Sequence, residues 1–375
     1  KQKTAYEIST RDWSSDVCSS DLALAEAHPG ARDADRVLME LAVALVESGR
    51  PADAERALDD LRRLHPRSPR VAESWLETGE CRFDAGDTAG AADAYRHALA
   101  AAEGNRSAAA VREQALHKLA WCDSLSGDAV AAARAFAAQL EAFPDGPCSA
   151  DGRVMLGDVL FRSDRAEEAL EVLGEALAEP ARVSSADLVG LATIRAAECE
   201  ARQGDHAAAL RRLDEWAGPA SDAGVSATTR RLARFARAEA LHGLGRNDDA
   251  LAAFRTLADE GLDAPDAGAE IAARARLMEG EILFEQDRHA DAIAAFFKVA
   301  YGFGDREAPA AFRPWQAQAT FEAARCCDVL GKPDQARTLY AELVERHPDA
   351  PWVAAARKRL DALERSEEHT SELQS

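Results

Sequence analysis

Residues 75–98 read WLETGECRFDAGDTAGAADAYRHA and contain one full copy of a pattern that runs through most of the chain. Small and apolar residues recur at helical spacing on both sides of Gly86. A glycine between two such runs is typical of a helix that ends in a left-handed residue before the chain turns back. The stretch therefore predicts a helical hairpin with Gly86 at its turn.

The same hairpin pattern repeats along the chain at spacings of 37 to 44 residues. Seven residues before each turn stands an alanine or glycine, five residues after it an alanine, and nine residues after it a large apolar residue. The turn residues are Gly49, Gly86, Gly127, Asp164, Gly204, Gly245, Asp287 and Gly331. A repeat of this length indicates a stacked array, because one hairpin cannot bury its apolar face alone.

The pattern resembles the tetratricopeptide repeat. The second copy carries most of that family's motif, namely Trp75, Gly79, Gly86, Ala91, Tyr95 and Ala98. The resemblance covers nearly all of residues 23–364 and implies an all-α fold, a right-handed superhelical solenoid of about eight helical hairpins. The chain departs from the family at Asp164 and Asp287, which replace turn glycines, and at Gln139, which replaces an apolar residue. The period also exceeds the family's usual length, so we expect longer helices or longer connections.

Both ends of the chain differ from the repeats. Residues 365–375, RSEEHTSELQS, resemble a translated sequencing-library adapter, and residues 12–22, DWSSDVCSSDL, resemble the translation of its reverse complement. We therefore expect residues 1–22 and 365–375 to be non-native, adapter-derived tails, with residues 23–364 an array that starts in mid-repeat. The alternative at either end alone is a natural polar tail.

Composition narrows the range of partners. The chain has 375 residues, with 66 Asp and Glu against 45 Lys and Arg, and a formal net charge of −21. Such an acidic chain is unsuited to nucleic acid or to an anionic membrane surface, because phosphate binding needs clustered cations. It also lacks an uncharged apolar stretch of about 18 residues, so we expect no direct membrane insertion of this fragment.

The sequence offers little chemistry for catalysis. We expect neither enzyme activity nor a cofactor or metal site, because no phosphate-binding loop, nucleophile elbow or zinc-ligand spacing is present. One cysteine per repeat occupies the same position in four repeats, which indicates small buried apolar residues rather than disulfides. The aromatic residues between Tyr301 and Trp315 are expected to seal a joint between repeats; the alternative is a binding patch.

The resemblance also implies a candidate binding groove. In the family, the concave wall is formed largely by first helices, and residues six and three before each turn face into it. Transferred to this sequence, that geometry selects Glu80, Phe83, Trp121, Asp158, Phe161, Glu198, Glu239, Glu281 and Phe284. We therefore expect a groove that binds a basic, partly apolar segment of another protein. The alternative is a solvated acidic face on a chain that is acidic throughout.

The resemblance implies a non-catalytic scaffold or adaptor that binds partner proteins or peptides. The passages HPDAPWVAAARKRLDAL and FPDGPCSADGRVMLGDVLF also resemble repeats of bacterial envelope proteins, such as outer-membrane assembly lipoproteins and periplasmic division coordinators. This favours the bacterial periplasm or cell envelope over the cytoplasm. Two alternatives stay open: a regulatory or substrate-docking array of a larger enzyme whose catalytic domain is missing from this fragment, and a cytosolic regulatory adaptor.

Overall fold

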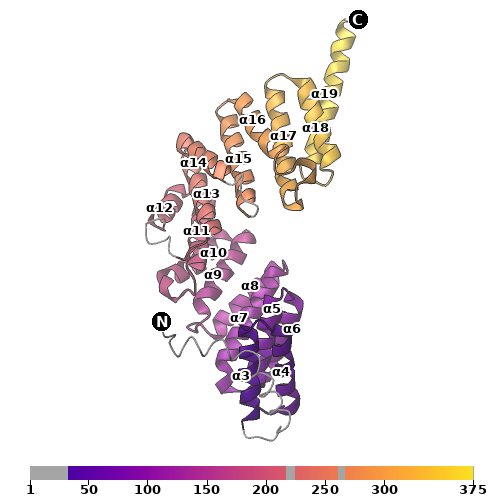
Figure 1. The fold of residues 1–375 in the computed structure, drawn as a ribbon. Helices are drawn as coiled ribbons and strands as arrows, with labels where there is room; N and C mark the ends of the chain where they lie inside the picture. The colour runs from indigo at the N-terminus through magenta and orange to yellow at the C-terminus, as the bar shows by residue number, and fades with distance from the viewer. Residues whose placement is uncertain (1–32, 217–223, 261–266, 375) are drawn as a thin grey trace, which may run out of the picture. The chain divides into compact units, whose positions relative to one another are not determined.

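The structure, a computed structural model, describes residues 33–216, 224–260 and 267–374. These residues form α-helices joined by turns and short 3₁₀ segments, and they contain no strand (Figure 1). The predicted all-α repeat fold is thereby confirmed. Residues 1–22, predicted to be a non-native tail, lie outside the described part. So does the predicted start of the array at residues 23–32.

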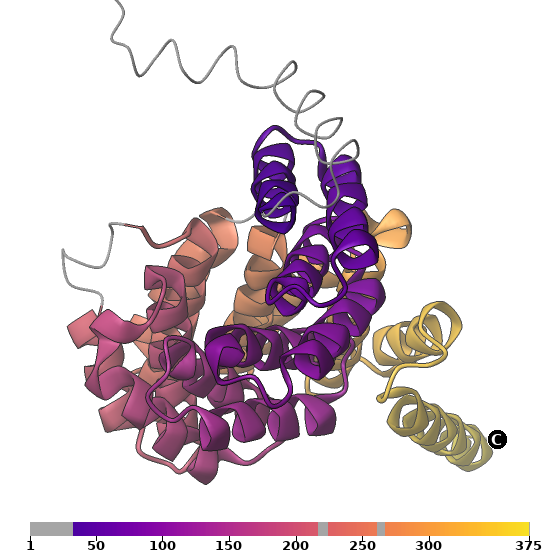
Figure 2. The same ribbon diagram turned by 90° about the horizontal axis from the view of Figure 1, so that it is seen from below.

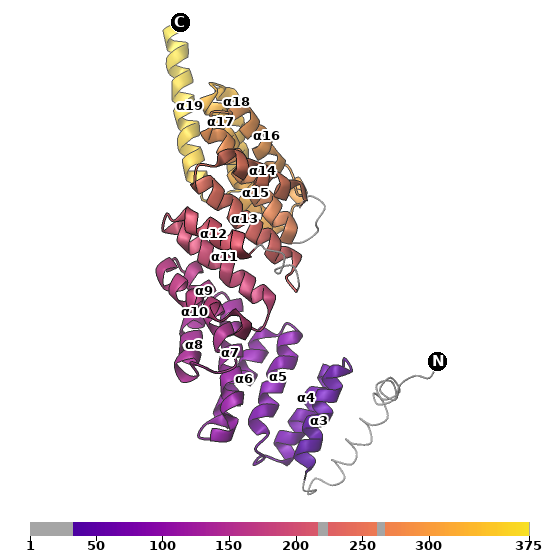
Figure 3. The same ribbon diagram turned by 90° about the vertical axis from the view of Figure 1, so that its left-hand side faces the viewer.

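The chain divides into two compact units, Lys1–Ser184 and Ser185–Ser375. In the first unit, first and second helices alternate in chain order, and each helix packs on its neighbours in the chain (Figure 3). Its α-helices are α3 (Ala34–Glu47), α4 (Pro51–Leu64), α5 (Val71–Asp84), α6 (Thr88–Ala102), α7 (Ala109–Leu125), α8 (Ala129–Ala142), α9 (Ser149–Arg162) and α10 (Ala166–Ala178). Two 3₁₀ turns join them, η1 (Arg106–Ala108) and η2 (Pro180–Arg182).

The second unit repeats this alternation. Its α-helices are α11 (Ala186–Arg202), α12 (His206–Trp216), α13 (Ala227–Gly243), α14 (Asn247–Glu260), α15 (Ala267–Glu285), α16 (His289–Ala300), α17 (Arg313–Val329), α18 (Pro333–Arg346) and α19 (Val353–Gln374). The 3₁₀ turns η3 (Asp305–Glu307) and η4 (Ala310–Phe312) lie between α16 and α17. Helix α19 packs on α18 (Figure 2), with Ala356 buried. The backbone of α19 continues without a break through the predicted tail boundary at residue 365.

Every predicted turn residue has a left-handed backbone. The φ angle of Gly86 is +80°, and the two aspartates that replace glycine, Asp164 and Asp287, have φ of 61° and 59°. Around Gly86, its own N–H donates to the carbonyl of Phe83 at 2.9 Å, and the next N–H donates to the carbonyl of Arg82 at 2.9 Å. These bonds satisfy carbonyl groups at the end of α5, as a left-handed helix cap does. The aspartates keep the turn because a short polar side chain tolerates this conformation better than other non-glycine residues do.

Two helices of a hairpin meet where a small residue faces a large one. A Cβ added at Gly79 of α5 would lie 2.3 Å from the ring of Tyr95 on α6. Gly280 bears the same relation to Phe296 in the α15–α16 hairpin, at 2.4 Å. All the large residues nine positions after the turns are buried, namely Leu58, Tyr95, Phe136, Leu173, Leu213, Phe254, Phe296 and Tyr340. The large side chain therefore covers the small residue of its own hairpin as well as filling space toward the next.

The longer period is explained mainly by longer first helices. Where the turns are 37 residues apart, the first helix that follows has 14 residues, as in α5 and α9. Where the spacing is 40 or more, the first helix has 17 residues in α7, α11, α13 and α17, and 19 in α15. About one extra helical turn has been added at these positions.

Gln139 is fully buried, and its polar side chain is satisfied by hydrogen bonds to the α8–α9 connection and to α7. Its Nε2 donates to the carbonyl of Cys148 at 3.1 Å, and its Oε1 lies 3.1 Å from Nδ1 of His117. Glu113, also buried, accepts from the backbone N–H of Cys148 at 2.8 Å. These bonds fix the α8–α9 connection to α7, so the departure from the family pattern has a local polar role.

The prediction of buried cysteines is confirmed, and three of the four aromatic residues predicted to seal a joint pack on the core, whereas Tyr301 is exposed over 40% of its surface. The four equivalent cysteines are buried, and burial raises the pKa of the Cys199 thiol to about 11. In the α16–α17 connection, the rings of Phe303 and Phe312 stack at 5.1 Å, and both pack with Trp315 on the apolar core of the second unit. This connection seals a joint between hairpins.

The repeat register can be tested by enlarging buried alanines. Ala132→Leu in α8 and Ala250→Leu in α14 should each lower the free energy of unfolding by about 1–3 kcal/mol, because a leucine cannot fit between the helices without shifting them. Ala137→Leu and Ala252→Leu, at exposed positions of the same two helices, are matched controls and should change it by less than about 0.5 kcal/mol. Urea unfolding measures all four. Neutral results at both buried positions would contradict the register.

Candidate functional site

The predicted groove residues all lie on first helices, and in each unit they fall in two rows, six and three residues before the turns. The first unit places Glu80 and Phe83 on α5, Trp121 on α7, and Asp158 with Phe161 on α9. The second unit places Glu198 on α11, Glu239 on α13, and Glu281 with Phe284 on α15. Because each hairpin repeats the same offsets from its turn, equivalent side chains follow one another from helix to helix within a unit.

In the first unit, Lys118 of α7 joins the two predicted residues of α5. Its ammonium group donates to the Glu80 carboxylate at 2.5 Å and lies 5.6 Å from the ring of Phe83. Glu80 also accepts from the hydroxyl of Tyr95 at 2.7 Å. Glu80 and Phe83 are half-buried, so part of each remains open to solvent.

Trp121 is held by a neutral histidine. Its indole N–H donates to Nε2 of His117 at 3.0 Å, while Nδ1 of that histidine faces Gln139. Burial lowers the pKa of His117, which favours the neutral ring that this pair of bonds requires. Asp158 and Phe161 differ from the others: only 7% and 8% of their surface is exposed, and Asp158 pairs with Arg162 at 2.9 Å. They offer little surface to a ligand.

In the second unit, Glu239 lies between two other predicted carboxylates, Glu198 and Glu281, which act on its pKa. Burial and the neighbouring Glu198 and Glu281 raise the pKa of Glu239 to about 7, against an opposing effect of Arg274. Glu198 pairs with Arg195 at 2.7 Å, and Glu281 accepts from Nε2 of Gln318 at 3.2 Å. The three acidic side chains thus form a continuous row across α11, α13 and α15.

A further carboxylate, Glu322 of α17, acts on Glu281 at the end of this row and was not predicted from the sequence. Burial and then the charge of Glu322 raise the pKa of Glu281. Glu322 stands nine residues before its turn instead of six, and Glu40 and Glu77 hold the same offset in the first unit. The recurrence of glutamate nine residues before a turn was the sequence signal that could have identified Glu40, Glu77 and Glu322.

Phe284 lies at the edge of this acidic row. The guanidinium of Arg325, on the next first helix, stands 5.1 Å from the centre of its ring, and the ring of His289 lies 4.9 Å away. Phe284 is half-buried. The partly exposed aromatic residues Phe83 and Phe284 therefore each already contact one cation of their own unit.

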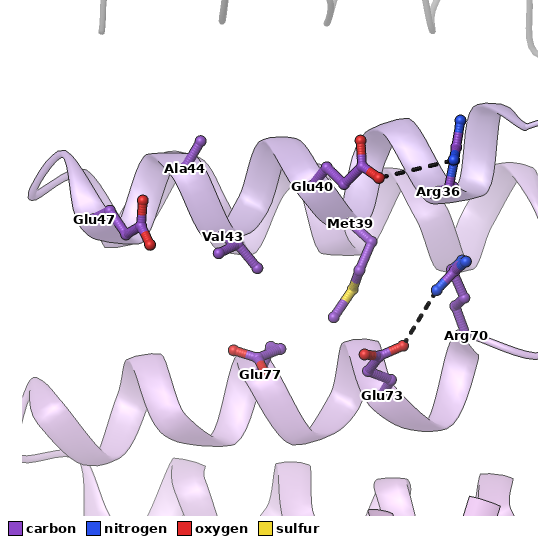
Figure 4. Close-up of a pocket in the computed structure, with 9 residues that line it drawn as sticks. All are labelled: Arg36, Met39, Glu40, Val43, Ala44, Glu47, Arg70, Glu73 and Glu77. Atoms are coloured by element: carbon purple, nitrogen blue, oxygen red, sulfur yellow. Dashed lines mark ion pairs between the residues drawn. The ribbon is translucent and has the colours of Figure 1, made fainter. Parts of the chain in front are cut away.

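A groove that was not predicted lies between α3 and α5 in the first unit. Figure 4 shows side chains of the two helices facing each other across it. Its volume is about 370 Å³, and its lining residues are Arg36, Met39, Glu40, Val43, Ala44, Glu47, Arg70, Glu73 and Glu77. Val43 occupies the position six before its turn, in line with Glu80, and was not among the predicted groove residues.

The described part of the chain contains neither a cluster of metal-ligating side chains nor a helix able to span a membrane. Within residues 33–216, 224–260 and 267–374, no three His, Cys, Asp or Glu side chains are grouped as metal ligands would be. In the same ranges no helix combines the length and the apolar character needed to cross a membrane.

Comparison with known protein families identifies the repeats. A tetratricopeptide-repeat family model matches residues 39–106 and 235–312, and a second tetratricopeptide-repeat model matches residues 317–350. These three stretches of the chain therefore match tetratricopeptide repeats. No curated protein sequence matches the chain.

Solved structures show the same fold. A tetratricopeptide repeat protein from Parabacteroides merdae matches with a TM-score of 0.52 and 16% identity over 76% of this chain and 98% of its own. The apo form of RapI matches with a TM-score of 0.54 and 13% identity over 89% of this chain and 98% of its own. A signal transduction ATPase with a tetratricopeptide repeat sensor, from Pyrococcus horikoshii, matches with a TM-score of 0.59 and 13% identity. The match covers 90% of this chain and 50% of the ATPase. At these identities the likeness is one of fold.

The acidic row of the second unit can be tested through stability. Since the folded protein raises the pKa of Glu239 from 4.5 to about 7, its ionised form is disfavoured in the fold, and folding loses stability as pH rises from about 4.5 to 7. Glu239→Gln should therefore raise the free energy of unfolding at pH 8 by about 1–3 kcal/mol, with a smaller gain at pH 5.5.

Urea unfolding at the two pH values measures the effect. Glu345→Gln, at an exposed position of α18, is the control and should change stability by less than about 0.5 kcal/mol at either pH. An unchanged or lower stability of Glu239→Gln at pH 8 would contradict the crowding of carboxylates described here.

Proposed function

We propose that this chain is a non-catalytic interaction scaffold whose first-helix surface binds a basic, partly apolar segment of another protein. Tetratricopeptide-repeat proteins generally act as protein-interaction scaffolds, and stacked helical repeats present extended surfaces suited to that role. The observation that carries the finer proposal is the acidic row of the second unit, where Glu239 stands between Glu198 and Glu281.

The charge of the partner follows from the crowding in this row. Burial first, and then like charges on neighbouring helices, raise the pKa values of Glu239 and Glu281, so the ionised forms of both groups are disfavoured in the fold. A lysine or arginine of a partner placed along the row would stabilise the ionised carboxylates. Binding of a basic segment is therefore favoured electrostatically, and added salt should weaken it.

We infer that the partner segment is partly apolar because two aromatic side chains, Phe83 and Phe284, lie on the first-helix surface. Phe83 and Phe284 each have a cation of their own unit near the ring, Lys118 at 5.6 Å and Arg325 at 5.1 Å. Both rings are half-buried, so part of each is open to solvent beside that cation. A partner's side chain could displace Lys118 or Arg325 from the ring and take up the same contact.

A second candidate function is a sensor or docking array that belongs to a larger enzyme. The signal transduction ATPase from Pyrococcus horikoshii carries its tetratricopeptide repeats as a sensor, and this chain spans half of that protein. The two candidates differ in what accompanies the repeats in the natural gene. A setting in the bacterial envelope is supported by the sequence resemblance alone.

The proposed function is tested by reversing charge in the acidic row. Glu198→Lys combined with Glu239→Lys should weaken binding of a partner recovered with the wild-type chain by at least about fivefold, and should flatten the dependence of affinity on salt. The control is Asp248→Lys with Glu345→Lys, which changes net charge equally at exposed positions of the second helices α14 and α18. Circular dichroism establishes that both double variants fold.

The measurement is the dissociation constant by titration calorimetry at two salt concentrations. Equal affinity and equal salt dependence for wild type and the Glu198/Glu239 variant would rule out this surface as the binding site.

A further inference from the structure

The groove between α3 and α5 has two matching walls. The α3 wall presents Arg36, Glu40, Val43 and Glu47, which fall three or four residues apart and so lie on one helix face. The α5 wall presents Arg70, Glu73 and Glu77 at the same kind of spacing. Each wall therefore starts with an arginine near its helix N-terminus and becomes acidic toward its C-terminus (Figure 4).

The arginine end of the groove is already neutralised. Arg36 lies 3.8 Å from the carboxylate of Glu40, and Arg70 lies 3.6 Å from that of Glu73. The other end differs. Within the described part of the chain, neither Glu47 nor Glu77 forms an ion pair with a lysine or arginine. Two carboxylates thus remain to attract a cation from outside.

Two local effects make a cation favourable at that end. Glu47 is the last residue of α3, where the helix dipole is negative, and the last turn of α3 contains no basic residue. Glu77 is half-buried, and burial together with Glu80 and Glu73 raises the pKa of its carboxyl group, against an opposing effect of Lys118. The surroundings of Glu77 therefore disfavour its negative charge, and a positive charge placed between Glu77 and Glu47 would offset this.

The middle of the groove is apolar. Val43 lines the groove and is exposed over 42% of its surface. Met39 lies beside it on the side of α3 that faces α5, with 5% of its surface exposed (Figure 4). A volume of about 370 Å³ falls within the range of roughly 300–1,000 Å³ that is usual for ligand pockets.

We infer that this groove docks a segment of another protein that sets an apolar side chain against Met39 and Val43 and a lysine or arginine between Glu47 and Glu77. The inference rests on the proposed function, since it names the kind of partner segment and the place where it is anchored. The single acidic end also gives the bound segment a direction: its cation lies toward the C-termini of α3 and α5.

Selection of peptides from a random phage-displayed library tests this without knowledge of the partner. The wild-type chain should select peptides with Lys or Arg within about four residues of an aliphatic or aromatic residue. Glu47→Lys combined with Glu77→Lys should lower the affinity for the selected peptides by at least about tenfold. Fluorescence anisotropy of the labelled peptides measures this affinity. Val43→Ser should weaken them by about threefold or more, because apolar contact area is lost.

The matched control is Glu167→Lys with Glu171→Lys, at exposed positions of α10 in the same unit, which makes the same change of net charge. It should leave the affinity of the selected peptides within about twofold, since exposed charges far from a site act weakly in salt. Thermal unfolding of each variant near the wild-type midpoint establishes that the groove variants retain their fold. Peptides that bind the Glu47/Glu77 variant as tightly as wild type would overturn the groove.

The same peptides separate this inference from the proposed function. If they lose affinity for the Glu198/Glu239 variant and keep it for the Glu47/Glu77 variant, the groove inference is refuted and the acidic row of the second unit is supported. If they keep full affinity for both variants, the groove inference and the proposed function are refuted together.

Discussion

In each hairpin, the first and second helices meet where an alanine or glycine faces a buried leucine, phenylalanine or tyrosine. At Gly79 and Gly280 even a methyl group would collide with the opposing ring, so the helix axes are held as close as backbone and side chain allow. This contact uses the inward face of both helices. The binding surfaces considered lie on the first helices, where some side chains, such as Glu80 with Tyr95, still contact the second helix of their own hairpin. The site is thus a consequence of how the hairpin closes.

The parts of the fold that could be predicted are those that local chemistry determines. A left-handed turn requires glycine or a residue that tolerates the conformation, so Gly86 and Asp164 could both be recognised from spacing alone. The small and large positions were predictable for the same reason, because they recur at fixed offsets from each turn. The extra turn in α7 and α15 was not assigned, since an alanine-rich sequence marks helix ends weakly.

The candidate site was predicted less completely, because it depends on how neighbouring hairpins stack. The spacing rule placed Glu198, Glu239 and Glu281 in one row, and the effect of Glu198 and Glu281 on the pKa of Glu239, second to that of burial, agrees with that placement. It could not show that Phe161 is buried, nor that a groove opens between α3 and α5. Periodicity assigns a residue to a helix face, whereas accessibility depends on the distance between faces from different repeats.

Within each unit, helices pack mainly on their immediate neighbours in the chain. Contacts of this kind give a low contact order, so hairpins should form quickly and independently before they stack. The same contacts allow each unit to open locally, because each helix interface involves mainly neighbouring helices. A tensile load applied across a unit would act equally on every interface in the series, so the weakest interface would open first and the chain would lengthen in steps of about one hairpin.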